Sequence, residues 1–111
     1  MGMSNNTATD LTVANIIKDQ IGPKAFFMMG AANLLGDESS LTFKVGRNPR
    51  SVSHVRVTLD ADDTYTVEFL RCTTSHKTYQ TTRKVLQSDS LVYAEDLHRV
   101  IHSGTGLFLS L

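Results

Sequence analysis

Two short segments in the middle of the chain alternate apolar and polar residues and are joined by an acidic turn. Residues 54–59 place an apolar side chain at every second position, and residues 64–69 repeat this pattern. A period of two is that of a strand with one buried face. Because the tetrapeptide DADD at residues 60–63 favours a tight turn, the two runs predict a β-hairpin. The fold must therefore contain an antiparallel sheet with one covered face.

Two elements precede the hairpin and differ in their apolar pattern. Apolar residues at helical spacing predict a helix over residues 10–21, and the Gly22–Pro23 pair ends it. Residues 24–32 carry aromatic and methionine side chains and no charge after the first position, which predicts a strand buried on both faces. The Phe and Met side chains at positions 26–29 would then belong to the core, the alternative being an adaptable binding surface.

The other segments around the hairpin are more polar. Residues 33–40 are predicted as a loop, residues 41–45 as a half-buried strand and residues 46–50 as a second loop. Beyond the hairpin, the Thr-rich residues 77–85 predict a further, more exposed strand. Leu70 has the parity of the outer face, which predicts either a strand end or a second covered patch.

The last part of the chain predicts a helix and an apolar tail. Ser88 or Asp89 is the expected N-cap of a helix over residues 89–103, and Gly104 is its expected C-cap. Residues 107–111 are too apolar to remain in water, so we expect them to form a short strand or to pack on the core. The predicted inner stripe of this helix consists of Val92, Leu97, Val100 and Ile101.

These elements together predict an α+β fold. We expect a four- to five-stranded antiparallel meander, an N-terminal and a C-terminal helix packed on one face, and a short apolar C-terminal strand. With 111 residues the chain has the size of one small domain. We therefore predict a disordered tail over residues 1–8 and a single domain over residues 9–111.

Charge and cysteine content exclude several classes of protein. Lys and Arg together number 11, as do Asp and Glu, so the formal net charge is zero and a histone-like polycation is excluded, although a local basic patch is not. The one cysteine, Cys72, excludes an intramolecular disulfide and a cysteine-based zinc site. The first residues lack the charged and apolar regions of a signal peptide, and no apolar run approaches the length of a membrane helix. We therefore expect a cytoplasmic protein.

Six motifs follow one another along the chain: FMMGAAN (27–33), LTFKV (41–45), VRVTL (55–59), DTYTVEF (63–69), VYAEDL (92–97) and TGLFLSL (105–111). This ordered series resembles a family of small proteins without assigned activity that bacteriophages, prophages and other mobile elements encode. The resemblance implies an accessory protein in the cytoplasm of a bacterial host, and it implies no catalytic residues.

A basic patch on the outer face of the sheet is the first candidate site. Its residues lie on neighbouring predicted strands or in the adjoining loop, and Arg side chains match the geometry of phosphate oxygens. The patch would bind nucleic acid or an acidic partner. The alternative is a solvated sheet face on which Glu68 pairs with Arg56 across the hairpin. The candidate residues are Lys44, Arg47, Arg50, His54, Arg56 and Arg71.

Three other constellations have simpler explanations. Glu95, His98 and His102 share one face of the predicted helix and could bind zinc, but Arg99 follows His98 and would repel a cation, so a polar helix face explains them better. The acidic residues 60–63 resemble part of a calcium loop without its glycine, and a hairpin turn explains them better. Cys72 and His76, four residues apart, lack a third group that would make a catalytic nucleophile.

Three functions compete on these observations. The first is a non-enzymatic protein that binds a host or phage protein, as an inhibitor or an anti-defence adaptor. The second is a nucleic-acid-associated protein that uses the basic patch. The third is a metal-dependent enzyme. We expect binding rather than catalysis, with no cofactor, and we expect a homodimer formed through the apolar tail and an exposed edge strand.

Overall fold

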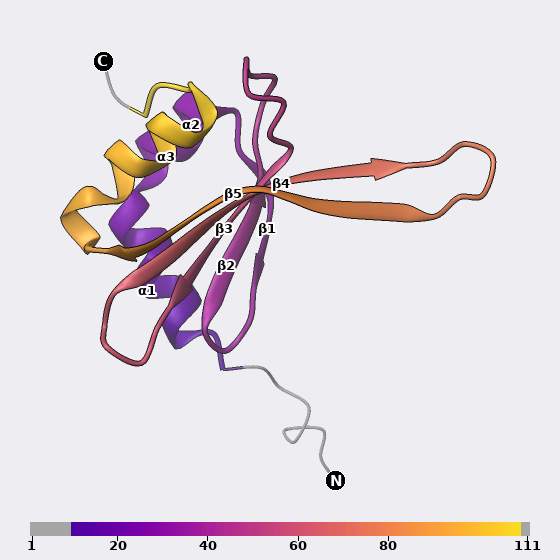
Figure 1. Ribbon diagram of the computed structural model, residues 1–111. Helices are drawn as coiled ribbons and strands as arrows, with labels where there is room; N and C mark the ends of the chain where they lie inside the picture. Colours follow the sequence, from indigo (N-terminus) through magenta and orange to yellow (C-terminus); the bar gives the residue numbers. More distant parts are fainter. Residues whose placement is uncertain (1–9, 110–111) are drawn as a thin grey trace, which may run out of the picture.

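The computed structural model describes residues 10–109 and shows an antiparallel meander with helices on one side (Figure 1). The five strands are hydrogen-bonded in the order β1-β2-β3-β4-β5, which confirms the predicted α+β class. The predicted tail at residues 1–8 lies outside the described residues. The elements are α1 (Thr12–Ile21), α2 (Pro23–Met29), β1 (Ala32–Gly36), β2 (Ser40–Lys44), β3 (His54–Leu59), β4 (Tyr65–Thr74), β5 (Thr81–Val92), η2 (Ala94–Asp96) and α3 (Leu97–Thr105).

The predicted hairpin is β3 and β4. Val55 pairs with Phe69, and Val57 pairs with Val67, so the apolar side chains of both strands share the inner face. The turn closes through a hydrogen bond of 2.8 Å from the backbone N–H of Asp60 to the carbonyl of Thr64. The period-two pattern is therefore confirmed in its register as well as in its strands.

The inner face of the sheet and the three α-helices enclose one apolar core. Phe43 and Phe69 are fully buried at its centre, and Phe26 meets the Phe43 ring edge-on with 5.1 Å between the ring centroids. The rest of the core comes from both ends of the chain, so the packing joins α1 and α3 through the sheet. Its other large members include Ile17, Ile21, Met29, Val55, Val57, Val67, Leu97 and Ile101.

The prediction of a buried strand over residues 24–32 is wrong, because this segment forms α2. Pro23 occupies the first turn, and Gly30 ends the helix in the left-handed conformation with φ 64°. Phe26 and Met29 are buried one turn apart, whereas Phe27 between them is 85% exposed. A short apolar run cannot distinguish a buried strand from a helix by periodicity alone, and the flanking Pro and Gly are the better signals here.

The predicted loop over residues 33–40 is also partly wrong, because residues 32–36 form β1. This strand pairs antiparallel with β2 at the edge of the sheet, and all of its residues are exposed. Neither face is buried, so the strand has no apolar alternation that would reveal it. Its pairing is irregular between Ala32 and Leu35, where Asn33 adopts a φ of 54°.

The predicted helix over residues 89–103 begins eight residues later than expected. Asp89 lies in β5 opposite Val67 rather than at an N-cap, and α3 begins only at Leu97. Gly104 is inside α3, and the C-cap is Gly106, with φ 79°. Residues 107–109 form no strand. Leu109 is buried against the core, in agreement with the alternative prediction that the tail packs there.

Beyond the row that joins Leu70 to Val85, β4 and β5 leave the sheet together as a two-stranded arm (Figure 1). We call residues 71–84 the β-arm. Its turn covers residues 75–80, so the strand predicted over 77–85 begins at Thr81 instead. Leu70 is only 2% exposed although its strand continues, which confirms a second covered patch on the outer face.

A Cβ atom at position 104 has no room. Gly104 packs on the ring of Phe69, and an added methyl group would overlap the ring carbons. We expect Gly104→Ala to lower the free energy of unfolding by about 3 kcal/mol or more, because overpacking a core forces backbone shifts. Urea unfolding followed by circular dichroism measures this. Ser103→Ala, on the exposed face of α3, is the matched control, and equal midpoints for the two variants would contradict the packing described here.

Candidate functional site

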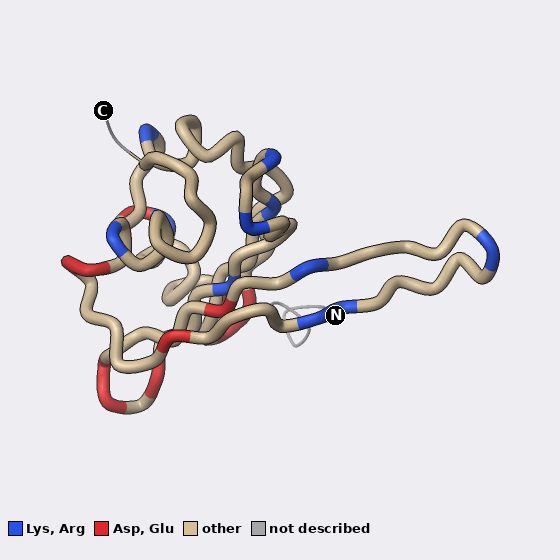
Figure 2. The backbone as a smooth tube through the Cα atoms, turned by 45° about the horizontal axis from the view of Figure 1, so that its top comes forward, with Lys and Arg blue, Asp and Glu red and all other residues tan. Residues whose placement is uncertain are grey.

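The meander sends alternate connections to opposite ends of the sheet. The β1–β2 and β3–β4 turns leave at one end, and the β2–β3 loop and the β-arm leave at the other (Figure 1). The two turns at the first end carry acidic residues and no Lys or Arg: Asp37, Glu38, Asp60, Asp62 and Asp63. The loop and the arm carry basic residues and no Asp or Glu. In Figure 2 the acidic residues of the β3–β4 turn are red, and blue segments mark the basic residues along the arm.

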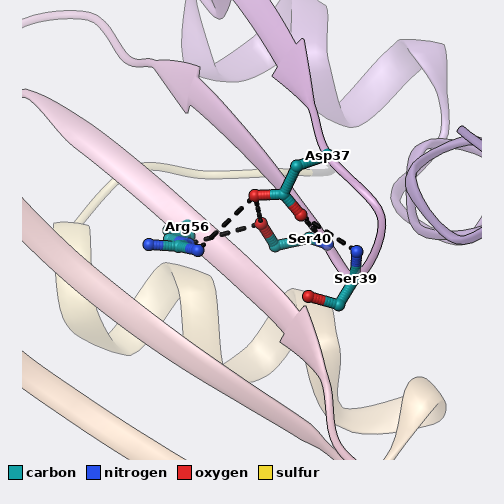
Figure 3. A network of polar contacts seen from close by, with 4 residues as sticks. All are labelled: Asp37, Ser39, Ser40 and Arg56. Carbon is teal, nitrogen blue, oxygen red and sulfur yellow. Dashed lines mark hydrogen bonds and ion pairs between the residues drawn. The ribbon is translucent and has the colours of Figure 1, made fainter. Parts of the chain in front are cut away.

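Hydrogen bonds within the turns hold the acidic side chains of the first end. Asp37 accepts hydrogen bonds from the backbone N–H groups of Ser39 at 2.9 Å and Ser40 at 2.8 Å, and from the Ser40 hydroxyl at 2.8 Å (Figure 3). These bonds, with that of the Ser39 backbone contributing most, lower the pKa of Asp37. Asp62 likewise accepts from the hydroxyl and backbone N–H of Thr64. The acidic residues therefore build the turns, as the hairpin explanation of residues 60–63 expects.

Arg56 belongs to this acidic end rather than to the basic patch. It lies opposite Glu68 in the β3–β4 register, as predicted, but its ion pair is with Asp37, at 3.5 Å between Nη2 and Oδ2. Its Nε also donates to the Ser40 hydroxyl at 3.3 Å (Figure 3). Arg56 is thus occupied in linking β3 to the β1–β2 turn.

The opposite end of the outer face carries a row of side chains across three strands. Lys44 of β2, His54 of β3 and Leu70 of β4 are neighbours in the register. His54 is half-buried and lies 2.8 Å from the Ser53 hydroxyl. Burial, followed by the positive charges of Lys44 and Arg83, lowers the pKa of His54. Three basic groups from different strands are therefore close enough to act on one another.

The β2–β3 loop holds Arg47 and Arg50 at the same end. The Asn48 side chain organises this loop: its amide donates to the carbonyls of Gly46 at 2.9 Å and Val52 at 2.7 Å. Its Oδ1 accepts from the backbone N–H groups of Arg50 and Val52. Both Arg side chains are exposed above this fixed backbone.

The β-arm holds the predicted Arg71 and adds three basic residues that the sequence prediction did not include. Lys84 lies directly opposite Arg71, Arg83 lies opposite Cys72, and Lys77 is in the turn. Residues 69–88 contain no Asp or Glu, and this acid-free stretch is the signal that could have identified them. We call the combined set the basic surface: Lys44, Arg47, Arg50, Arg71, Lys77, Arg83 and Lys84.

No member of the basic surface forms an ion pair with an Asp or Glu side chain among the described residues. Over residues 10–109 the two ion pairs are Arg56–Asp37 and Arg99–Asp96, and neither includes a member of the surface. Arg71 and Lys84 even place like charges on directly opposed positions, an arrangement that destabilises a strand pair. These side chains are therefore free to meet an anionic ligand.

The predicted metal ligands are placed differently. Glu95 lies in η2, before the start of α3, so the helical spacing that would align it with His98 and His102 does not apply. His98 Nε2 lies 2.7 Å from the carbonyl oxygen of Ile21, and His102 Nδ1 lies 2.8 Å from that of Leu107. A carbonyl only accepts, so each of these nitrogens donates. In the described part of the chain, no three His, Cys, Asp or Glu side chains form a group suited to a metal ion.

Cys72 and His76 are separated by the geometry of the arm. Cys72 is in the paired part of β4, and its backbone N–H donates to the Ser53 hydroxyl at 2.8 Å. His76 lies in the turn at the tip of the arm. The spacing of four residues would bring side chains together on a helix, but here the chain is extended.

Comparison with protein-family models, with curated proteins and with solved structures finds no match. Among residues 10–109, none of the helices has the length and apolar character needed to cross a membrane.

The electrostatic coupling at the basic end has a measurable consequence. We expect His54 to titrate below the ordinary histidine pKa, and Lys44→Gln and Arg83→Gln each to raise its pKa by removing a neighbouring positive charge. NMR titration of the imidazole resonances measures both effects. Lys18→Gln, an equal charge change on α1, should leave the His54 pKa unchanged. An ordinary His54 pKa that neither substitution moves would contradict this geometry.

Proposed function

We propose that this protein binds nucleic acid through the basic surface, and that it does so without catalysing a reaction. The observation that supports the proposal is the separation of charge along the strands: acidic turns at one end, and the basic loop and arm at the other. Phosphate contacts from Lys and Arg supply most of the affinity of a protein for nucleic acid. A net charge of zero does not oppose this, because local fields rather than the total charge steer a polyanion.

The acidic end gives the proposed complex an orientation. It would repel the phosphate backbone, so the protein would approach with the β2–β3 loop and the β-arm foremost. Phosphate near His54 would favour the protonated imidazole and raise its pKa, so binding should strengthen as the pH falls toward 6. Arg56 would take no part, because its ion pair with Asp37 is at the other end of the sheet.

Salt dependence tests the proposal quantitatively. If about six of the basic residues contact phosphates, the affinity for duplex DNA should fall roughly a thousandfold between 50 and 200 mM salt. We expect Arg47→Glu/Arg50→Glu to weaken binding at least tenfold and to reduce the slope of affinity against salt. Fluorescence anisotropy with a labelled oligonucleotide measures both.

The matched control makes the same change of charge on the helical side of the sheet. Lys18→Glu/Arg99→Glu should bind within about twofold of the unmodified protein, because these residues lie on α1 and α3. The proposal fails if both double variants lose affinity equally, or if the unmodified protein binds neither duplex nor single-stranded nucleic acid in low salt.

A protein partner, the first of the functions that the sequence analysis considered, is a second candidate function. One specific observation favours it. Leu91 is 68% exposed and has a φ of 56°, although a left-handed backbone costs a leucine about 1–2 kcal/mol. Leu91 lines an open hollow of about 260 Å³ between β5 and α3, and Tyr93, two residues further along the chain, is 57% exposed. An apolar anchor held in strained backbone is typical of a binding surface.

Replacing Leu91 tests whether its left-handed backbone lowers the stability of the protein. We expect Leu91→Asn to increase the free energy of unfolding by about 1 kcal/mol, because Asn tolerates the left-handed region. Thermal unfolding measures the change, and Leu86→Asn, at another exposed position of β5, is the control. If both substitutions destabilise the protein equally, Leu91 is not strained and the second candidate loses its support.

The predicted homodimer stays a prediction. The edge strand β1 offers unpaired backbone groups and the exposed side chain of Leu35, as an edge-to-edge contact would need.

A further inference from the structure

The β-arm projects from the sheet with both of its faces exposed (Figure 1). A two-stranded ribbon outside a core is marginally stable in water, so its persistence here depends on continuity with β4 and β5. Its strands stay in direct register from Arg71–Lys84 to Thr74–Thr81, and the hydroxyl groups of the last pair are 3.2 Å apart. The arm is thus a regular ribbon that contributes nothing to the core.

We propose that the β-arm lies in the major groove of duplex DNA. This inference rests on the proposed function and names its ligand. Two antiparallel strands are about 4.8 Å apart, and side chains widen the ribbon beyond the roughly 6 Å of the minor groove. The major groove of B-form DNA, about 12 Å wide, admits a two-stranded ribbon. The major groove of A-form RNA is too deep and narrow for side chains to read, so the geometry favours DNA.

The length of the arm fits the depth of that groove. The last pair, Thr74–Thr81, lies four residue steps beyond the row at Leu70–Val85, a distance of about 13 Å at the usual rise per residue. The major groove is about 8.5 Å deep. The turn at residues 75–80 can therefore reach the base edges while the base of the arm remains outside.

The side chains of the arm suit the two zones that it would cross. Arg71, Arg83 and Lys84 are at its base, level with the phosphate rims, where the like-charged pair of Arg71 and Lys84 would gain a counter-charge. Toward the tip the side chains are mainly hydroxyls, which donate to or accept from any base pair, so the contact would tolerate many sequences. The hydroxyl-bearing residues are Thr73, Thr74, Ser75, Thr78, Thr81 and Thr82.

Single-stranded nucleic acid is the weaker alternative. Base stacking on a protein needs aromatic side chains along the path of the strand. The β-arm has one aromatic residue, Tyr79, which is 82% exposed in the turn. A single aromatic residue at the tip cannot stack successive bases of a single strand along the surface. It is compatible with a ribbon whose tip reaches the floor of the groove.

Groove-specific DNA probes test the inference on the full chain. One duplex carries glucosylated hydroxymethylcytosine, which fills the major groove, and an unmodified duplex of the same sequence is saturated with a netropsin-type ligand, which fills the minor groove. We expect the major-groove modification to weaken binding at least tenfold, and the minor-groove ligand to change it less than twofold. Single-stranded DNA of the same sequence should bind more weakly than the unmodified duplex.

An arm-shortened variant identifies the element responsible. Replacing residues 73–82 by Asn-Gly joins the opposed Cys72 and Arg83 through a two-residue turn and keeps Arg71, Arg83 and Lys84. The core is untouched, and an unchanged melting temperature checks the fold. This variant should bind the unmodified duplex at least fivefold more weakly and no longer respond to the major-groove modification. Lys77→Gln, which removes only the charge lost in the shortening, should keep that response.

Three outcomes would overturn the inference. They are a shortened variant that matches Lys77→Gln in affinity, competition by the minor-groove ligand alone, and tighter binding of the single strand. In each of these the protein still binds nucleic acid, so the proposed function survives. Absence of salt-sensitive binding to any of the DNA probes would overturn both.

Discussion

The antiparallel meander imposes the constraint on which the rest of the structure depends. Consecutive strands run in opposite directions, so every second connection must leave at the same end of the sheet. The acidic connections of this chain are the first and third, and the basic connections are the second and fourth. A sequence of zero net charge thereby becomes a molecule with two oppositely charged ends.

Packing keeps the two ends apart and leaves the arm free. Gly104 lets α3 approach Phe69 at the centre of the inner face, while Arg56 and Asp37 join β3 to the β1–β2 turn on the outer side. The sheet body is therefore a fixed platform. The β-arm begins where the cover of the helices ends, and none of its residues belongs to the core. Because its side chains do not pack in the core, the arm can carry mainly hydroxyl and basic residues.

The sequence predicted the hairpin and α1, whose apolar residues mark one buried face, and it missed the helical form of α2, the strand β1 and most of β5. The hairpin was found with its register because apolar residues alternate over 54–59 and 64–69, whereas α2 is a seven-residue apolar run whose periodicity is ambiguous. Strand β1 is exposed on both faces, so no apolar alternation marks it. Strand β5 was predicted only over residues 81–85, where Thr side chains favour a strand. The candidate site was likewise predicted only in part. Lys44, Arg47, Arg50 and Arg71 were predicted. The pairing of β4 with β5 adds Lys77, Arg83 and Lys84 to the same surface, and the absence of Asp and Glu over residues 69–88 was their signal in the sequence.

The central claim is that the basic end of the sheet is the binding surface, and NMR mapping with a short DNA duplex tests it directly. The account predicts that backbone amide shifts on titration concentrate in residues 44–54 and 70–85, with the acidic turns at residues 37–39 and 60–63 unaffected. Shifts centred on the acidic turns or on α1 and α3, or no shifts at low salt, would contradict it.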